Sequence, residues 1–242
     1  MKNLYQNTVL QPVSSQLLLS LNINSVDFLF PGFAFGDFAV LHCFSAVKSL
    51  LTRLCVRAQL PYQLGGLETN VLFVDGGNSF NLYDISSFAK ACELNPRKVL
   101  GRIFVSRAFT AYQLTSLVFE QLQTAIESYD SKVVVLSDIA RLYLDNDVPK
   151  KEAQEVFLQL TAYLSDFAKK NRIILVTSYP SGFWSKNGRF FKEVLCSRAN
   201  VVASVRKFRG RRCFILEKHP VFSLGKSEFP LGEVTLTDFW GG

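Results

Sequence analysis

The sequence predicts an α/β protein with a doubly wound, mostly parallel sheet that is flanked by helices and extended by a C-terminal antiparallel hairpin. Two observations favour the parallel part: short uninterrupted apolar runs, typical of strands buried on both faces, and amphipathic helical periods between them. A third favours the hairpin, because the pattern after Val194 changes to short runs of alternating polarity. With 48% hydrophobic and 19% charged residues, the composition also differs from that of disordered proteins.

Each predicted element has a local signal. The strands are apolar runs that end in small or polar residues, and they are expected at 38–42, 71–75, 132–137 and 172–178. Helices are expected where apolar residues recur every three or four positions, at 46–60, 85–92, 112–129 and 151–170. The hairpin is expected from two alternating runs, 200–206 and 211–217, which Arg209-Gly210 joins.

The chain shows no internal repeat and no linker long enough to separate two domains, so residues 26–242 are predicted to form a single core domain. Residues 1–25 form an N-terminal segment. Its apolar stretch Leu17-Leu-Leu-Ser-Leu21 makes it a candidate arm for docking on a partner protein. The phenylalanines that follow are further candidates for such a contact, with burial in the core as the alternative: Phe28, Phe30, Phe33 and Phe35.

Several classes of protein are not expected. No run approaches 18 apolar residues, and the start lacks the features of a secretory signal, so the sequence predicts an intracellular protein without a membrane span, cytoplasmic or, in a eukaryote, nuclear. Five cysteines without a CxxC pair and two histidines offer little material for a zinc site. The cysteines are therefore interpreted as reduced residues of the core, and no metal is expected.

The positive charge is concentrated in one region. Residues 186–226 carry eleven basic and two acidic side chains, a net charge of +9, while the whole chain carries +7. Aromatic residues lie among these charges, a combination that suits the backbone and stacked bases of single-stranded DNA. The alternative is a solvated hairpin with its Lys and Arg residues exposed. The candidate DNA-binding residues are Trp184, Lys186, Arg189, Lys192, Arg206, Lys207, Arg209, Arg211 and Arg212.

A degenerate phosphate-binding loop follows the first predicted strand. The pattern GxxxxGK[ST] has the length of residues 42–49, His-Cys-Phe-Ser-Ala-Val-Lys-Ser. Lys48 and Ser49 stand where the pattern requires them, but His42 and Val47 replace the two glycines. Glycines are needed there because backbone N–H groups approach the phosphates closely, and a Cβ would intrude. Taken alone, this match is no more than an ordinary helix start.

Six ordered blocks extend the match. Residues 59–67 (QLPYQLGGL), 71–80 (VLFVDGGNSF) and 105–110 (VSRAFT) resemble the ATPase core of the RecA/RadA recombinase family, in its archaeal and eukaryotic branch. Residues 133–138 resemble its second nucleotide motif, 175–179 the strand that senses the γ-phosphate, and 207–220 its basic hairpin. The resemblance covers residues 28–222 and implies a RecA-like fold. The family's small N-terminal helical domain has no counterpart here.

The departures from the family pattern concern the catalytic positions. The resemblance places the catalytic glutamate at Gly77, the magnesium-linked aspartate at Ser137 with Asp138 one residue late, and the γ-phosphate sensor at Tyr179. Losing the loop glycines, the base and the metal ligand together would remove most of the catalysis of phosphoryl transfer. The vestigial nucleotide site therefore comprises His42, Val47, Lys48, Ser49, Asp75, Gly77, Ser137, Asp138 and Tyr179.

The resemblance, with these losses, implies a non-catalytic recombinase paralogue that assists homologous recombination and DNA repair. Its expected partners are single-stranded DNA and a RecA/RadA-type recombinase or another paralogue in a hetero-oligomer, and no cofactor is expected. By resemblance, residues 180–191 take the place of the second DNA-binding loop and residues 141–151 that of the first.

Two alternatives stay open. One is a weak DNA-dependent ATPase that uses Lys48 and Ser49 and recruits Asp75 or Asp138 to magnesium, in which case ATP and Mg²⁺ are cofactors. The other is a scaffold that contacts only protein. Nucleotide binding separates the first alternative from the leading hypothesis, and salt-dependent DNA binding separates the second.

Overall fold

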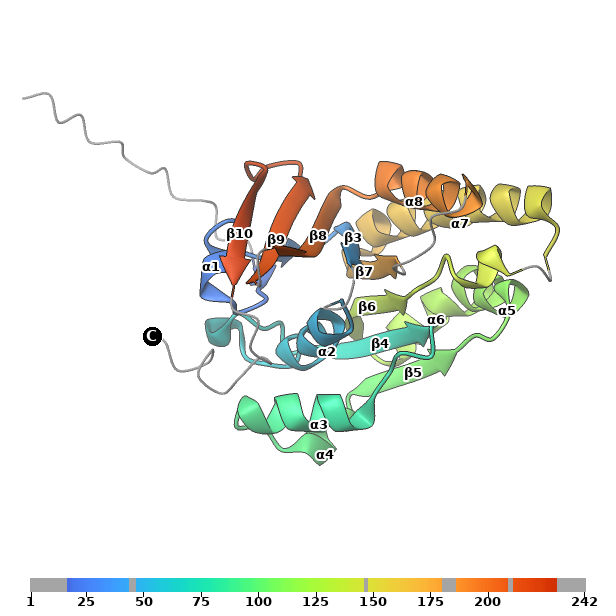
Figure 1. Cartoon of the computed structure of the whole chain (residues 1–242). Helices are drawn as coiled ribbons and strands as arrows, with labels where there is room; N and C mark the ends of the chain where they lie inside the picture. Colours follow the sequence, from blue (N-terminus) through green and yellow to red (C-terminus); the bar gives the residue numbers. More distant parts are fainter. Residues whose placement is uncertain (1–16, 44–46, 146–147, 180–185, 209–210, 230–242) are drawn as a thin grey trace, which may run out of the picture.

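The computed structural model describes residues 17–43, 47–145, 148–179, 186–208 and 211–229. These ranges form an open twisted sheet with helices packed on both faces (Figure 1). The strand order is β10-β9-β8-β3-β7-β6-β4-β5, parallel from β8 to β5 and antiparallel between β8, β9 and β10. The predicted fold class is confirmed.

The strands of this sheet contain the predicted apolar runs and two further segments. Residues of β6 and β7 are buried almost throughout, as expected for strands covered by helices on both faces. The strands are β3 (Phe38–Cys43), β4 (Asn70–Asp75), β5 (Ile103–Arg107), β6 (Ser131–Ser137), β7 (Ile174–Tyr179), β8 (Val201–Phe208), β9 (Arg211–Lys218) and β10 (Gly225–Phe229). A separate two-stranded sheet pairs β1 (Leu18–Leu19) with β2 (Phe33–Ala34).

Helices connect the parallel strands. Three begin with side-chain caps that the sequence contains: Asn81 accepts a hydrogen bond from the backbone of Tyr83, Asn95 precedes Pro96, and Thr110 caps the next helix. The helices are α1 (Asn24–Asp27), α2 (Val47–Arg57), α3 (Leu82–Ala91), α4 (Pro96–Leu100), α5 (Ala111–Ser116), α6 (Leu122–Ser128), α7 (Lys150–Asn171) and α8 (Lys186–Arg198). Shorter turns are η1 (Tyr62–Leu64), η2 (Leu117–Gln121) and η3 (Leu142–Leu144).

The two faces of the sheet have separate cores. On one face, the sheet packs against α2, α3 and α4, and on the other against α5, α6, α7 and α8. Each face therefore carries the helices that a doubly wound sheet requires. No helix within the described ranges is both long enough and apolar enough to cross a membrane.

Some elements differ from the expectation. The predicted helix at 112–129 is interrupted by the π-helical turn η2, which divides it into α5 and α6. The expected hairpin is present as β8 and β9, and β10 adds a further antiparallel strand to it. Helix α8 and strand β5 were not predicted as elements. Charged residues interrupt the apolar ones of α8, and β5 has only three consecutive apolar residues before Ser106 and Arg107.

The described part of the N-terminal segment packs on the core instead of extending from it. Leu19 and Leu21 are fully buried, and so are Phe30 and Phe33. The apolar surface of these four residues is therefore used within this chain. Phe28 is the exception among the candidate phenylalanines, since it is 95% exposed, while residues 1–16 lie outside the described ranges.

Candidate functional site

Residues predicted to form a vestigial nucleotide site end four strands at the carboxyl edge of the sheet. Strands β3, β7, β6 and β4 are parallel, so the residues that end them meet at one edge. The register places His42 of β3 opposite Tyr179 of β7, and Asp75 of β4 opposite Ser137 of β6. The structure thus brings together residues that are far apart in the sequence.

The carboxylate of Asp75 is hydrogen-bonded to the loop that follows it. The residue is 1% exposed, and its carboxylate accepts hydrogen bonds from the backbone N–H of Ser79 at 2.8 Å and of Phe80 at 3.1 Å. Arg107 adds a guanidinium Nε at 3.7 Å from the same carboxylate. The hydroxyl of Ser79 in turn bonds that of Ser137. Both oxygens of Asp75 therefore already have partners within the chain.

Gly77 and Asp138 compete for one space. A Cβ on Gly77 would lie 2.6 Å from Oδ2 and 2.8 Å from Cβ of Asp138, closer than real Cβ atoms approach. Asp138 has a left-handed backbone, with φ at 50°, and its Oδ1 accepts a hydrogen bond of 2.7 Å from the Ser178 hydroxyl. The backbone N–H of Asp138 donates to the same hydroxyl oxygen at 2.8 Å. A glutamate at position 77 cannot coexist with Asp138 in this position.

The side chain of His42 is bound to strand β9 of the hairpin. Its Nε2 lies 2.7 Å from Oε2 of Glu217, a residue of β9. The same carboxylate accepts a hydrogen bond from Ser204 at 2.6 Å and lies 3.4 Å from the guanidinium of Arg206. Burial alone would raise the pKa of Glu217, but the hydrogen bonds from His42 and Ser204 and the positive charges nearby lower the pKa to about 2.

The remaining described residues of the loop pattern differ in burial. Val47 is buried in the core cluster beneath α2, whereas Lys48 and Ser49 are exposed in the first turn of that helix. Residues 44–46, which connect them to β3, lie outside the described ranges. The two residues that would contact phosphate and magnesium are therefore accessible.

Tyr179 has a structural hydrogen bond. Its hydroxyl donates to the carbonyl oxygen of Gly188 at 2.6 Å, which ties the end of β7 to α8. Burial raises the pKa of this hydroxyl to about 12, so the tyrosine stays neutral. The ring packs in the core cluster on the α7 and α8 face.

The candidate DNA-binding residues fall into two groups. On α8, Arg189 is exposed and Lys192 is half-buried. On the hairpin, Arg206 and Arg211 are exposed and Arg212 is half-buried. Both groups border the carboxyl edge. Helix α8 is hydrogen-bonded to Tyr179 at the end of β7. On the hairpin, Ser204 is the register partner of His42, and Arg206 follows two residues later.

Some of these cations already have partners. Arg206 pairs with Glu217, and Arg211 lies 3.3 Å from the carboxylate of Glu228. Trp184 and Arg209 lie outside the described ranges, and of Lys186 and Lys207 only the backbone is described. Within the described ranges no three His, Cys, Asp or Glu side chains gather as metal ligands.

Three residues of this edge were not predicted from the sequence. Ser79, Arg107 and Glu217 each bind one of the predicted positions. The run Asp75-Gly-Gly-Asn-Ser79 carried a signal, since an aspartate often accepts hydrogen bonds from the turn that follows it. Glu217 is one of only two acidic residues in the basic segment, which could also have marked it.

Comparison with known proteins identifies the family. The Rad51 family model matches residues 33–178, which is more than half of the chain and includes β3, β4, β6 and β7. The meiotic recombination protein DMC1 of Saccharomyces cerevisiae is 34% identical over 86 residues, 36% of this chain and 25% of that protein. The DNA repair and recombination protein RadA of Aeropyrum pernix is 29% identical over 105 residues, 43% of this chain and 31% of that protein.

The alignments thus span less than a third of the length of each relative. The matched residues include β3, β4, β5, β6 and all but the last residue of β7, whereas α8, β8, β9 and β10 lie outside them. Together with the mostly parallel sheet, the match shows that the chain belongs to the Rad51 family.

Proposed function

We propose that this chain is a non-catalytic member of the Rad51 family that assists recombination by binding single-stranded DNA and a partner recombinase. One observation carries the first part: Asp138 occupies the space that a side chain at position 77 needs. With Gly77 in the position of the family's glutamate, this edge has no general base there, and the close packing leaves no room to restore one.

The polar network around Asp75 supports the same proposal. Its carboxylate accepts two backbone N–H groups and faces Arg107, while Ser79 and Ser137 bond each other. A metal would have to displace these hydrogen bonds, and a buried carboxylate loses stabilisation when its donors are removed. Magnesium recruitment through Asp75 is therefore disfavoured.

The weak ATPase stays as a second candidate because Lys48 and Ser49 are exposed at the start of α2. They are the two residues of the loop that contact phosphate and magnesium in the pattern. Hydrolysis would still need a base and a metal ligand from elsewhere. The two candidates differ in one measurable property, which is ATP turnover.

The DNA-binding part rests on the charge at the carboxyl edge. Arg189 of α8 makes no ion pair within the described ranges, and the basic hairpin borders the same edge. Phe109, which follows β5, is 70% exposed, and Tyr112, three residues further along the chain, is also exposed. Exposed aromatic rings at the same edge of the sheet as these cations offer a surface on which unpaired bases stack.

The test combines DNA binding and ATP turnover. We expect a fluorescent oligothymidylate to bind with the same affinity in the presence and absence of ATP and Mg²⁺, with no ATP hydrolysis above background. Lys48→Ala is expected to change neither quantity. Hydrolysis that is stimulated by DNA and lost in Lys48→Ala would contradict the proposal and establish the weak ATPase.

The partner-binding part rests on the edge strand β5. This strand ends the sheet, and Val105, Ser106 and Arg107 are exposed along it. A cavity of about 290 Å³ opens beside it, between β4, β5, η2 and α6. An edge strand with one unpaired side next to a pocket is suited to a partner peptide that adds a strand and inserts one side chain.

Val105→Pro tests this surface, because the backbone N–H of Val105 faces the free side of β5, and proline removes this donor from the edge. We expect the variant to lose co-purification with a recombinase of the same organism while its thermal stability changes little. The matched control is Lys226→Pro on β10, at the other edge of the sheet. Equal partner capture by wild type and Val105→Pro would reject β5 as the docking edge.

A further inference from the structure

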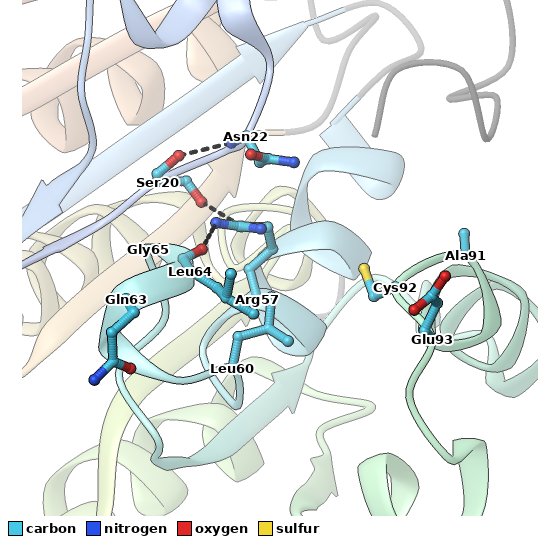
Figure 2. A pocket seen from close by; sticks show the side chains of 10 residues that line it. All are labelled: Ser20, Asn22, Arg57, Leu60, Gln63, Leu64, Gly65, Ala91, Cys92 and Glu93. Carbon is cyan, nitrogen blue, oxygen red and sulfur yellow. Dashed lines mark hydrogen bonds between the residues drawn. The ribbon is translucent and has the colours of Figure 1, made fainter. Parts of the chain in front are cut away.

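A cavity of about 740 Å³ opens at the end of the sheet opposite the nucleotide motifs. Helices α2 and α3 run back from the carboxyl edge, and the cavity lies where they end, at Arg57 and at Ala91 and Cys92 (Figure 2). Turn η1 and the segment around Ser20 complete its walls. Its volume is within the range of small-molecule sites.

Arg57 supplies a buried cation to this cavity. The residue is 4% exposed, and its Nε donates to the carbonyl oxygen of Ser20 at 3.1 Å, while Nη2 donates to the carbonyl oxygen of Leu64. Figure 2 shows the guanidinium between these two groups. Its Nη1 has no partner within the described ranges and is not sealed from solvent. This atom is available to a ligand.

A second buried cation lies near Arg57. Arg53, one helical turn earlier, is also buried and donates to two backbone carbonyl oxygens. Asp27 is a half-buried acid beside these two cations; burial raises its pKa, and the charges of both arginines partly offset that effect. Glu93 lines the cavity from the side of Cys92, well apart from the guanidinium in Figure 2, and its side chain faces solvent. An anion in the cavity would therefore meet a buried guanidinium, and hydrogen bonds between ionised groups are the strong ones.

The cavity also has an apolar wall. Leu60 and Ala91 contribute buried and half-buried surface, and Leu64 lies at the opening with 58% of its surface exposed. Polar groups that fix a ligand's orientation, set among apolar side chains that contact its body, are the usual composition of a binding site for small organic molecules.

We propose that this cavity binds a small organic anion, whose carboxylate or phosphate group pairs with Arg57 and whose apolar part packs on Leu60 and Leu64. The inference is independent of DNA and nucleotide binding, since the cavity shares no residue with the carboxyl edge.

Cys92 offers a direct readout, because this free thiol lines the cavity. Cys196, a half-buried free thiol on α8, serves as the internal control. Alkylation of both cysteines by N-ethylmaleimide is followed by peptide mass spectrometry with added phenyl phosphate, benzoate, inorganic phosphate or neutral benzyl alcohol. We expect phenyl phosphate or benzoate to slow alkylation of Cys92 alone, with half-protection below about 1 mM, a modest affinity on the usual scale. Benzyl alcohol should have no effect.

Leu64→Glu places a carboxylate at the opening, where it would repel an anionic ligand, and it does not alter the core. The matched control is Leu82→Glu, at an equally exposed leucine outside the cavity. We expect Leu64→Glu to weaken protection of Cys92 at least fivefold and Leu82→Glu to leave it unchanged. Absence of protection by both organic anions at 10 mM, roughly ten times the expected limit, would overturn the proposal. Equal protection in Leu64→Glu and wild type would overturn it too.

Discussion

At the scale of single residues, Gly77 leaves room for Asp138 at the carboxyl edge. A side chain at position 77 would need the space that Asp138 fills. The left-handed backbone of Asp138 carries its carboxylate to Ser178, which holds it there. Asp138 can take this position only because residue 77 has no Cβ.

Gly77→Ala is expected to destabilise the fold by about 1–3 kcal/mol, the usual cost of overpacking. In an Asp138→Gly background the same substitution should cost much less, because the clashing side chain is gone and glycine tolerates the positive φ. Urea denaturation of the four proteins of this double-mutant cycle measures the coupling.

Gly101→Ala is the matched control for this cycle. Its Cβ would meet its nearest neighbour at 3.3 Å, and that neighbour belongs to α4. It should cost the same with and without Asp138. If Gly77→Ala costs as much in the Asp138→Gly background as in wild type, the competition between the two residues is not real.

At the scale of elements, Glu217 connects the basic hairpin to the central strand. The carboxylate on β9 receives His42 from β3 together with Ser204 and Arg206 from β8. Three neighbouring strands are thus held together at one point, beside the vestigial loop. His42, which stands at the first glycine position of the loop pattern, thus supports the hairpin.

The lowered pKa of Glu217 predicts an acid-dependent contribution to stability. The folded state holds the charged form, so the contribution is fully present above the ordinary glutamate pKa of about 4.5 and is lost as the pH falls from there towards 2. At pH 7 we expect Glu217→Gln to lower the free energy of unfolding by about 1–3 kcal/mol. The difference from wild type should shrink steadily below pH 4.5, as chemical denaturation across pH will show.

Glu228→Gln is the comparison for this effect. Its carboxylate on β10 forms a single, more exposed ion pair with Arg211. Exposed pairs contribute little, so this variant should change stability by less than about 0.5 kcal/mol. A Glu217→Gln difference that stays constant down to pH 3 would mean that the lost charge is not what destabilises the variant.

At the scale of the whole molecule, two basic elements border one edge of the sheet. The basic α8 and the basic hairpin border the carboxyl edge, while Lys169 and Lys170 lie at the end of α7, at the opposite edge. Single-stranded DNA that binds the first group should leave the second untouched. The arrangement yields a direct comparison between basic residues of similar exposure.

We expect the affinity for oligothymidylate to fall with salt, with a log–log slope that flattens by about 0.7 when Arg189 is replaced by alanine, the value for one phosphate contact on a single strand. Lys170→Ala should leave the slope unchanged. Fluorescence anisotropy over a salt series gives both values. Binding that does not depend on salt, or equal slopes in wild type and Arg189→Ala, would remove α8 from the DNA-binding surface.

Much of the fold could be predicted because its signals are local. The strands at 71–75 and 132–137 were visible as continuous apolar runs, and the 22 residues of α7 as a helical period. Strand β5 and helix α8 could not be predicted in this way, since β5 lies at the edge of the sheet, where it needs no continuous apolar run, and charged residues interrupt α8.

The sequence by itself determined which residues occupy the positions of the nucleotide motifs and that the basic charge gathers in one segment, because both depend only on residue identity and order. Only the tertiary structure decided that Asp138 fills the space at Gly77, that Glu217 holds His42, and that Arg57 lines a cavity. Those contacts join residues separated by tens to more than a hundred positions, and chain order carries no information on which of them meet until the strands pair and the helices pack.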